Sequence, residues 1–253
     1  MRYFVLYALP YITFLVFVLG CGYRLAMWLR SPVPLKIPVT PAPTTRRGIV
    51  ARYISEILIF RTLFAGDKAL WLASWVFHVT LAFVIGGHVV GFFLSEFVCE
   101  LRGWTPSEYE RFSFIAGGHL GVLILLSLLY LFVRRMQEER VRYISRPGDY
   151  FALLLLLAIV ITGDCLRFFY SIRLFVVRDY LVGLITFCGA AAPAAKLFAW
   201  HFFLVNALVM YLPFGKLVHA GGIFFSPTHN QRDNARDQRH LNPWNEPEAE
   251  QSE

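Results

Sequence analysis

Residues 200–219 read WHFFLVNALVMYLPFGKLVH. Apart from Lys216, Asn206 and two histidines this stretch is apolar and rich in aromatic residues, and it is long enough to cross a bilayer, which takes about 20 residues. A histidine nevertheless lies near each end, His201 and His219. Ionisable side chains are costly inside a membrane unless they are paired or liganded, so both histidines are candidates for a functional role.

The rest of the chain also has the composition of a membrane protein. Of its 253 residues, 57% are hydrophobic and only 16% are charged, whereas a soluble domain carries about 25% charged residues. Its mean hydropathy is +0.54. We therefore predict an all-α integral membrane protein with five transmembrane helices, which cover roughly 3–28, 71–97, 112–133, 149–170 and 196–219.

The positive charges predict the orientation of these helices. Seventeen of the 24 Lys and Arg residues fall in the segment between spans one and two, the segment between spans three and four, and the tail. Because cytoplasmic loops collect Lys and Arg, the N-terminus is expected outside and the C-terminus in the cytoplasm. This bias accounts for the net charge of +7, and no basic run with interleaved aromatic residues indicates a nucleic-acid partner.

The apolar spans and the charge distribution divide the chain into four expected segments. We expect a first transmembrane helix over residues 1–30, a Pro-rich linker and interfacial amphipathic helix over 31–70, a four-helix core over 71–220, and a cytoplasmic polar tail over 221–253. The VLGC sequence at 18–21 resembles a lipoprotein cleavage box. Apolar sequence continues beyond its cysteine, which favours an uncleaved first span.

Cysteine spacing argues against one class of metal site. The four cysteines show no C-x-x-C motif, so an iron–sulfur or zinc framework is not expected. A disulfide among Cys99, Cys165 and Cys188, which are expected towards the outer face, stays open at this point.

Span two holds a second pair of histidines, His78 and His88. In the expected orientation His78 is the inner histidine of span two and His88 the outer one, while His201 is outer and His219 inner on span five. Antiparallel helices therefore oppose His88 to His201 and His78 to His219. Two such bis-histidine sites are typical of a helix bundle that binds two haems b, with the histidines ligating the haem iron.

Glycines near His88 fit the same interpretation. Gly86 and Gly87 precede this histidine and Gly91 follows it. Small residues let a flat macrocycle approach the helix backbone. The alternative is that some of the histidines are packed core residues bonded to backbone carbonyls, as we expect for His119, which has no opposed partner. Zinc fits less well, because the histidines fall at two depths and there is no H-E-x-x-H motif.

The histidine spacings also conflict with straight helices. Ten residues place His78 and His88 about 15 Å apart and rotated by about 80°, whereas eighteen place His201 and His219 about 27 Å apart on one face. Helix tilt and a kink at Pro213 are expected to absorb this mismatch.

The motifs FHVTLAFVIGGHVVGFF, FIAGGHLGVL and WHFFLVNALVMYLPFGKLVH resemble the cytochrome b gamma subunits of respiratory nitrate reductases over roughly residues 50–220, with the same histidine spacings. The tail sequence FFSPTHNQRDNARDQRHLNPW is similar to the M subunit of the membrane complex associated with dissimilatory sulfite reductase. The second resemblance implies five spans and two haems b in the cytoplasmic (inner) membrane of a bacterium or archaeon.

The resemblance implies a function in electron transfer. It indicates a dihaem cytochrome b subunit that passes electrons between menaquinone or menaquinol and a cytoplasmic iron–sulfur subunit related to heterodisulfide reductases, in sulfur or sulfite respiration. Other membrane and periplasmic cytochrome subunits are expected in the same complex. A nitrate-reductase-type gamma subunit, a membrane anchor without haem and a proton-relay transporter are the alternatives.

Candidates for the quinone site are few. The nitrate reductase subunits have a lysine before span three that is implicated in quinol binding, whereas this chain has SEYERF there. Asp164, Arg111 and Gly87 near His88 are the residues we assign to the quinone, with an ion pair between Asp164 and Arg167 as the alternative. Lys216, one turn before His219, is expected either to pair with a haem propionate or to extend to the membrane interface.

Overall fold

The computed structural model describes the chain except for residues 32–37, 39–40, 171, 227–228, 230 and 235–253. In the described part all regular secondary structure is helical, which confirms the predicted all-α fold. Much of the predicted Pro-rich linker and most of the polar tail lie outside the described residues.

Four helical stretches are long and apolar enough to cross a membrane. Each corresponds to a predicted span, and they are Phe4–Arg30, Lys68–Arg102, Pro106–Gln137 and Pro147–Tyr170. The first combines η1 (Phe4–Ala8) with α1 (Leu9–Arg30), the second combines α4 (Lys68–Val89), η2 (Val90–Leu94) and α5 (Ser95–Arg102), and the last two are α6 (Pro106–Gln137) and α8 (Pro147–Tyr170).

The fifth span is broken. Helix α10 (Lys196–Tyr211) is followed by the short helices η3 (Lys216–Val218), α11 (His219–Gly222) and η4 (Ile223–Phe225), and the two parts meet at 71°. Pro213 has no N–H to continue the helix. At Gly215 an added Cβ would lie 2.6 Å from the Tyr211 ring, so a larger residue here would have to displace Tyr211. The kink expected at Pro213 is therefore a break that divides span five into two helical parts.

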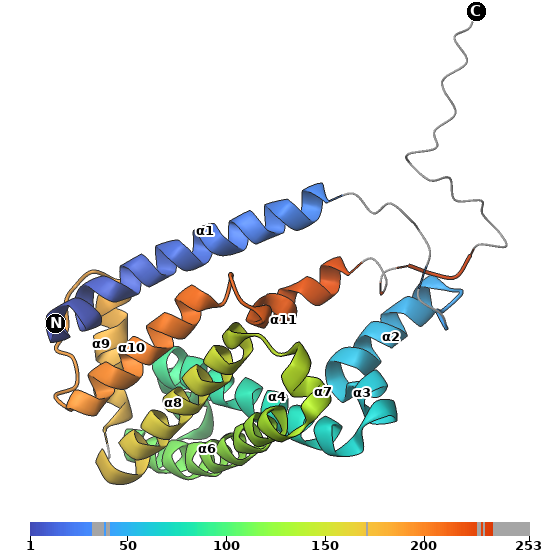
Figure 1. The fold of residues 1–253 in the computed structure, drawn as a ribbon. Helices are drawn as coiled ribbons and strands as arrows, with labels where there is room; N and C mark the ends of the chain where they lie inside the picture. Colours follow the sequence, from blue (N-terminus) through green and yellow to red (C-terminus); the bar gives the residue numbers. More distant parts are fainter. Residues whose placement is uncertain (32–37, 39–40, 171, 227–228, 230, 235–253) are drawn as a thin grey trace, which may run out of the picture.

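The spans lie side by side in Figure 1, with α9 (Leu174–Ile185) at the left end of the bundle and α2 (Arg46–Ile59) and α3 (Arg61–Gly66) at the right. Close packing runs from α4 to α6, from α6 to α8, from α8 to α10 and from α10 to α1. Helices α4 and α10 carry three of the four paired histidines. In the described chain, α4 packs on α6 and α10 packs on α8, and the two histidine-bearing helices do not pack extensively on each other.

Small residues on α6 allow α8 to approach closely. A Cβ on Gly118 would lie 3.2 Å from the Phe168 ring, and one on Gly121 would overlap the Asp164 carboxylate. Deeper in the bundle, Leu128 is fully buried beside Ile124. Without a hydrophobic driving force in lipid, close van der Waals packing of this kind holds membrane helices together.

The corner before α4 is fixed by polar contacts. The Asp67 carboxylate caps α4 by accepting a hydrogen bond from the backbone N–H of Leu70 at 2.9 Å, and it forms a 2.9 Å ion pair with Arg134 near the end of α6. The Leu70 N–H and the Arg134 guanidinium both favour the charged form, so they hold the pKa of Asp67 below its usual value. This pair ties the ends of two neighbouring spans together.

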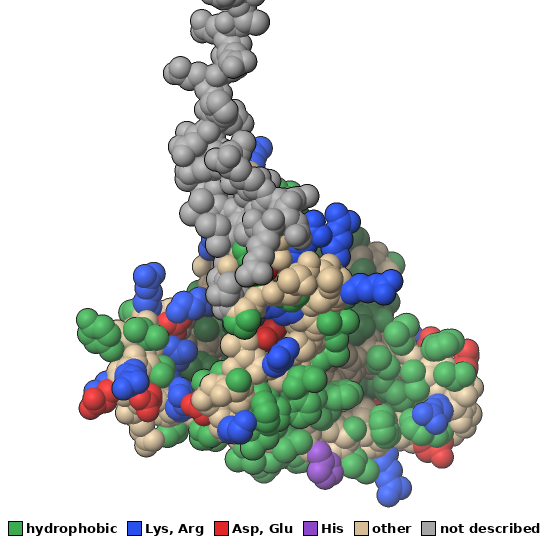
Figure 2. Space-filling model, turned by 90° about the vertical axis from the view of Figure 1, so that its right-hand side faces the viewer, with side chains coloured by type: hydrophobic (Ala, Val, Ile, Leu, Met, Phe, Trp, Pro, Cys, Tyr) green, Lys and Arg blue, Asp and Glu red, His purple; other side chains and the backbone are tan. Residues whose placement is uncertain are grey.

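Figure 2 views the molecule from the right-hand side of Figure 1, where α2 and α3 lie. Lys and Arg side chains surround a central hydrophobic area on this face. The four cysteines are free thiols, so the disulfide considered from the sequence is not formed here.

A matched pair of substitutions tests the packing of α6. Leu128→Ala removes a side chain with no exposed surface, and we expect it to lower the free energy of unfolding by about 2 kcal/mol or more because a cavity remains. The control is Leu126→Ala, two residues away on the lipid-facing side and 59% exposed; it should change stability by less than about 0.5 kcal/mol. Unfolding in mixed micelles measures both, and equal losses would contradict this packing.

Candidate functional site

The inner histidine pair is brought together by the break in span five. His78 on α4 and His219 at the start of α11 have ring centroids 6.0 Å apart, with the rings inclined at 81°. A first-row metal ion binds an imidazole nitrogen at about 2 Å, so two rings that face one ion bring their centroids to roughly 6 Å. The distance between the two rings therefore fits one shared metal ion.

The outer pair is formed by His88 on α4 and His201 on α10. These two imidazoles are close enough to interact electrostatically. The His201 ring lies over α8, where a Cβ on Gly163 would be 3.1 Å from its Cε1 atom. The structure thus brings together both of the histidine pairs that were predicted from the spacing.

Each of the four histidines has an oxygen partner at Nδ1. A carbonyl oxygen can only accept, so its partner nitrogen carries the proton and Nε2 keeps the lone pair that a metal ion requires. The Nδ1 contacts are His78 to Ser74 O at 2.7 Å, His88 to Val84 O at 2.6 Å, His219 to Lys216 O at 2.9 Å, and His201 to Thr162 Oγ1 at 3.0 Å.

The partner of His201 is a hydroxyl, and its own bonds decide the direction. Thr162 Oγ1 lies 2.7 Å from the Ala158 carbonyl oxygen and 3.0 Å from that of Ile159. Its single hydrogen is donated to one of these acceptors, so the hydroxyl accepts from His201 Nδ1–H. Sequence analysis missed Thr162, because hydroxyls in apolar helices usually bond only to their own backbone.

Open space beside His88 is the second feature that suits haem. A Cβ added to Gly86 or Gly87 would meet no atom within 4 Å, so this part of α4 leaves room for a flat group. Gly91 has a different role, because its added Cβ would lie 3.2 Å from Leu174 of α9. The donor set and the space at Gly86 and Gly87 therefore fit a haem, and the glycine at 91 serves helix packing.

His119 is a histidine outside the two pairs and serves as a comparison for the paired histidines. It makes the same local bond as three of them, with Nδ1 2.8 Å from Ile115 O. It is exposed on α6, as His88 and His219 are on their helices, and within the described chain no second imidazole lies against it. The Nδ1 bond alone is therefore common to helical histidines, and opposition across the bundle distinguishes the four.

An aromatic corner lies against His78 of the inner pair. Phe60, between α2 and α3, has a left-handed backbone with φ 53°, and its ring meets that of His78 edge-on at 5.1 Å. The indole N–H groups of Trp71 and Trp75 hold this corner by donating to the carbonyls of Ile59 and Leu58 at 2.7 and 2.9 Å. A non-glycine residue adopts this backbone at a cost of about 1–3 kcal/mol, and no sequence pattern indicated it.

Lys216 has a partner that the sequence did not suggest. Its Nζ lies 2.8 Å from Asp149 Oδ2, and Arg135 approaches the same oxygen at 3.7 Å. The Asp149 side chain is only 8% exposed, whereas that of Lys216 is 74% exposed. The lysine therefore ties the part of span five beyond the break to the beginning of α8.

Asp164 and Arg167 lie between α6 and α8 rather than on a free surface. The Asp164 carboxylate packs against Gly121, and Arg167 Nη1 donates to the Ser113 carbonyl at 2.7 Å. Arg167 also interacts electrostatically with both Asp164 and His88. Arg111 is exposed near the beginning of α6, so of the three quinone candidates Gly87 and Asp164 belong to the outer-histidine region.

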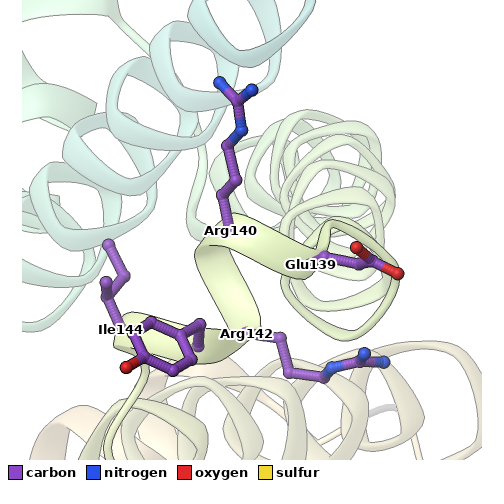
Figure 3. Close-up of a pocket in the computed structure, with 5 residues that line it drawn as sticks. Glu139, Arg140, Arg142 and Ile144 are labelled. Atoms are coloured by element: carbon purple, nitrogen blue, oxygen red, sulfur yellow. The ribbon is translucent and has the colours of Figure 1, made fainter.

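A surface pocket lies elsewhere, on the short helix α7 (Glu139–Ile144). Figure 3 shows Arg140 and Arg142 pointing away from one another there, so their charges do not converge on one ligand. The paired histidines are not among the residues that line it.

Opposed histidine pairs on membrane-spanning helices, each ring with a free Nε2, are an arrangement by which helical membrane proteins can hold haem. The chain belongs to the nitrate reductase gamma subunit family, whose model matches residues 47–233. The family resemblance inferred from the histidine motifs is thereby confirmed.

Three relatives illustrate the family. A Hdr-like menaquinol oxidoreductase cytochrome b-like subunit of Archaeoglobus fulgidus is 38% identical, over 93% of this chain and 81% of that protein. The subunit of the same description from Archaeoglobus profundus is 29% identical, over 95% and 82%. The nitrate reductase gamma chain of Bacillus subtilis is 34% identical over 45% of this chain and 48% of its own length.

Thr162 provides a test of the outer site. Thr162→Val keeps the side-chain shape but removes the oxygen that accepts from His201 Nδ1–H. Loss of a hydrogen bond that orients a ligating histidine weakens metal binding roughly 10–100-fold. We expect weaker haem retention at the outer site on titration of the purified protein. Thr80→Val is the control, since Thr80 Oγ1 bonds only carbonyls of its own helix; an equal effect of both substitutions would contradict the role of Thr162.

Proposed function

We propose that this chain is the membrane cytochrome b subunit of a quinol-oxidising complex and that it binds two haems b. One haem would lie between His78 and His219 and the other between His88 and His201. The observation that carries this proposal is the two pairs of opposed histidines, one at each depth, with the Nε2 lone pair of each ring free. The names of the two Archaeoglobus relatives support menaquinol as the electron donor.

The residues of the chain would hold and orient the cofactors. Haem b, when bound, supplies one-electron redox chemistry. The Nδ1 bonds fix the ring orientation and the tautomer of the ligands, and hydrogen bonding at Nδ1 raises the basicity of Nε2. The Phe60 ring would shield the His78 side of the inner pair.

The basic end of the bundle is the face that we assign to the cytoplasm. Arg135 lies there close to Asp149, and His78 and His219 are the nearer histidine pair. This orientation, with the N-terminus outside, follows from the positive-inside rule. We propose that a cytoplasmic iron–sulfur subunit of heterodisulfide reductase type docks at this end, which the Hdr-like names of the relatives support.

The physiological setting that we propose is sulfur or sulfite respiration, because the tail sequence is similar to subunits of the sulfite-reductase-associated complex. The four-helix unit over 71–220 would then form the dihaem core, and the tail over 221–253 would contact the cytoplasmic partner. Further membrane and periplasmic cytochrome subunits complete the proposed complex.

The quinol site that we propose lies beside His88. Oxidation of menaquinol to menaquinone releases two protons and two electrons, so it needs a proton acceptor next to a lipid-accessible space. Gly87 leaves such space open, and the Asp164 carboxylate is the nearest acid on α8. Asp164 would receive one quinol proton, and the second would leave towards the outer surface past Arg111. The two electrons would go, one at a time, to the redox group that His88 and His201 would hold.

The histidine pairing is tested by matched substitutions. His201→Ala should abolish the outer haem and keep the inner one, because only one ligand pair is broken. The control His119→Ala removes a histidine with the same local bond and no opposed ring, and it should keep both haems. Reduced-minus-oxidised spectra and redox titration measure the outcome; two unaltered haems in His201→Ala would refute the pairing.

The quinol site is tested in variants with full haem content. Asp164→Asn preserves shape but removes the proton acceptor, and we expect haem reduction by a menaquinol analogue to slow on the order of 100-fold or more. Arg111→Ala should have a smaller effect, because its side chain is exposed at the surface. Wild-type rates in both variants would place quinol oxidation elsewhere, at the inner histidines.

A further inference from the structure

The first span lies along the broken fifth span, and α1 packs on α10. In Figure 1 α1 runs beside α10 and continues past the break towards the end of α11. The family match covers residues 47–233, so α1 lies before the matched region. The contacts of α1 with the break indicate what this helix does for span five.

Three residues of α1 meet span five at successive points, and their spacing of four places them on one helix face. Gly20 meets the buried Pro213, where an added Cβ would lie 2.8 Å from the proline side chain. Trp28 stacks on Phe225 with ring centroids 5.2 Å apart. Arg24 lies between these two contacts, level with the break.

Arg24 binds the backbone that the break leaves without helical partners. Its Nε donates to the Pro213 carbonyl at 2.9 Å, and its Nη2 donates to the Phe214 carbonyl at 3.4 Å. In a continuous helix these carbonyls would accept from N–H groups four residues further on. Irregular backbone at membrane depth requires such replacement partners, and a guanidinium can serve two acceptors at once.

We propose that α1 holds the break in span five in place and that Arg24 is a positioning residue for His219. His219 follows Phe214 by five residues, and its ring must face His78 from beyond the 71° bend. From the other side, Tyr211 donates to the Gly148 carbonyl at 3.1 Å. The break is therefore held between α1 and α8, and among the described residues it is Arg24 of α1 that binds the freed carbonyls.

This inference rests on the proposed function, and the test separates the two. Low-spin bis-histidine haem gives an electron paramagnetic resonance signal that depends on the angle between the imidazole planes. Arg24→Ala should shift the signal and the midpoint potential of the His78/His219 site and leave those of the His88/His201 site unchanged. The control is Tyr23→Ala, which removes the neighbouring side chain on the lipid side, 65% exposed, and should change neither.

Further variants keep the proposal testable if Arg24→Ala does not accumulate in the membrane. Arg24→Lys retains the cation with fewer fixed donors and should shift the inner signal less, while Gly20→Ala should shift it by displacing Pro213. Unchanged inner signals in these variants would overturn the proposal, as would equal loss of both signals. A wild-type protein without haem would instead refute the proposed function.

Discussion

An imidazole inside a membrane needs a partner for its N–H group, and the histidine sites depend on how that need is met. The lipid offers no hydrogen bonds, so each paired histidine satisfies Nδ1 within the protein. Three use a carbonyl of their own helical segment and His201 uses the hydroxyl of Thr162. This arrangement leaves every Nε2 directed outward from its own backbone as a potential ligand.

The opposition of two histidine pairs also constrains the shape of span five. A straight helix would carry His219 about 27 Å beyond His201, far from the depth that His78 reaches on α4. The break between Tyr211 and Lys216 redirects the chain and brings His219 to His78. The polar contacts around that break, with Arg24 on one side and Lys216 with Asp149 on the other, follow from this redirection.

Sequence reasoning predicted the spans and the opposition of the histidines, because both follow from apolar length and residue spacing. It also pointed to Pro213 as the site of bending. It could not give the size of the bend, nor the contacts of Thr162, Phe60 and Arg24. Those depend on which faces of distant helices meet, and periodicity within one helix does not contain that information. The contact of Asp164 with Gly121, for example, results from the packing of α6 on α8 and could not be predicted from the sequence of either helix.

Two histidine pairs that hold two haems in one chain should be visible in the purified wild-type protein. Its haem content per polypeptide and its electron paramagnetic resonance spectrum in the oxidised state measure this. We expect two haems b and two distinct low-spin bis-histidine signals. A single haem, or a protein that purifies intact without haem, would contradict this expectation.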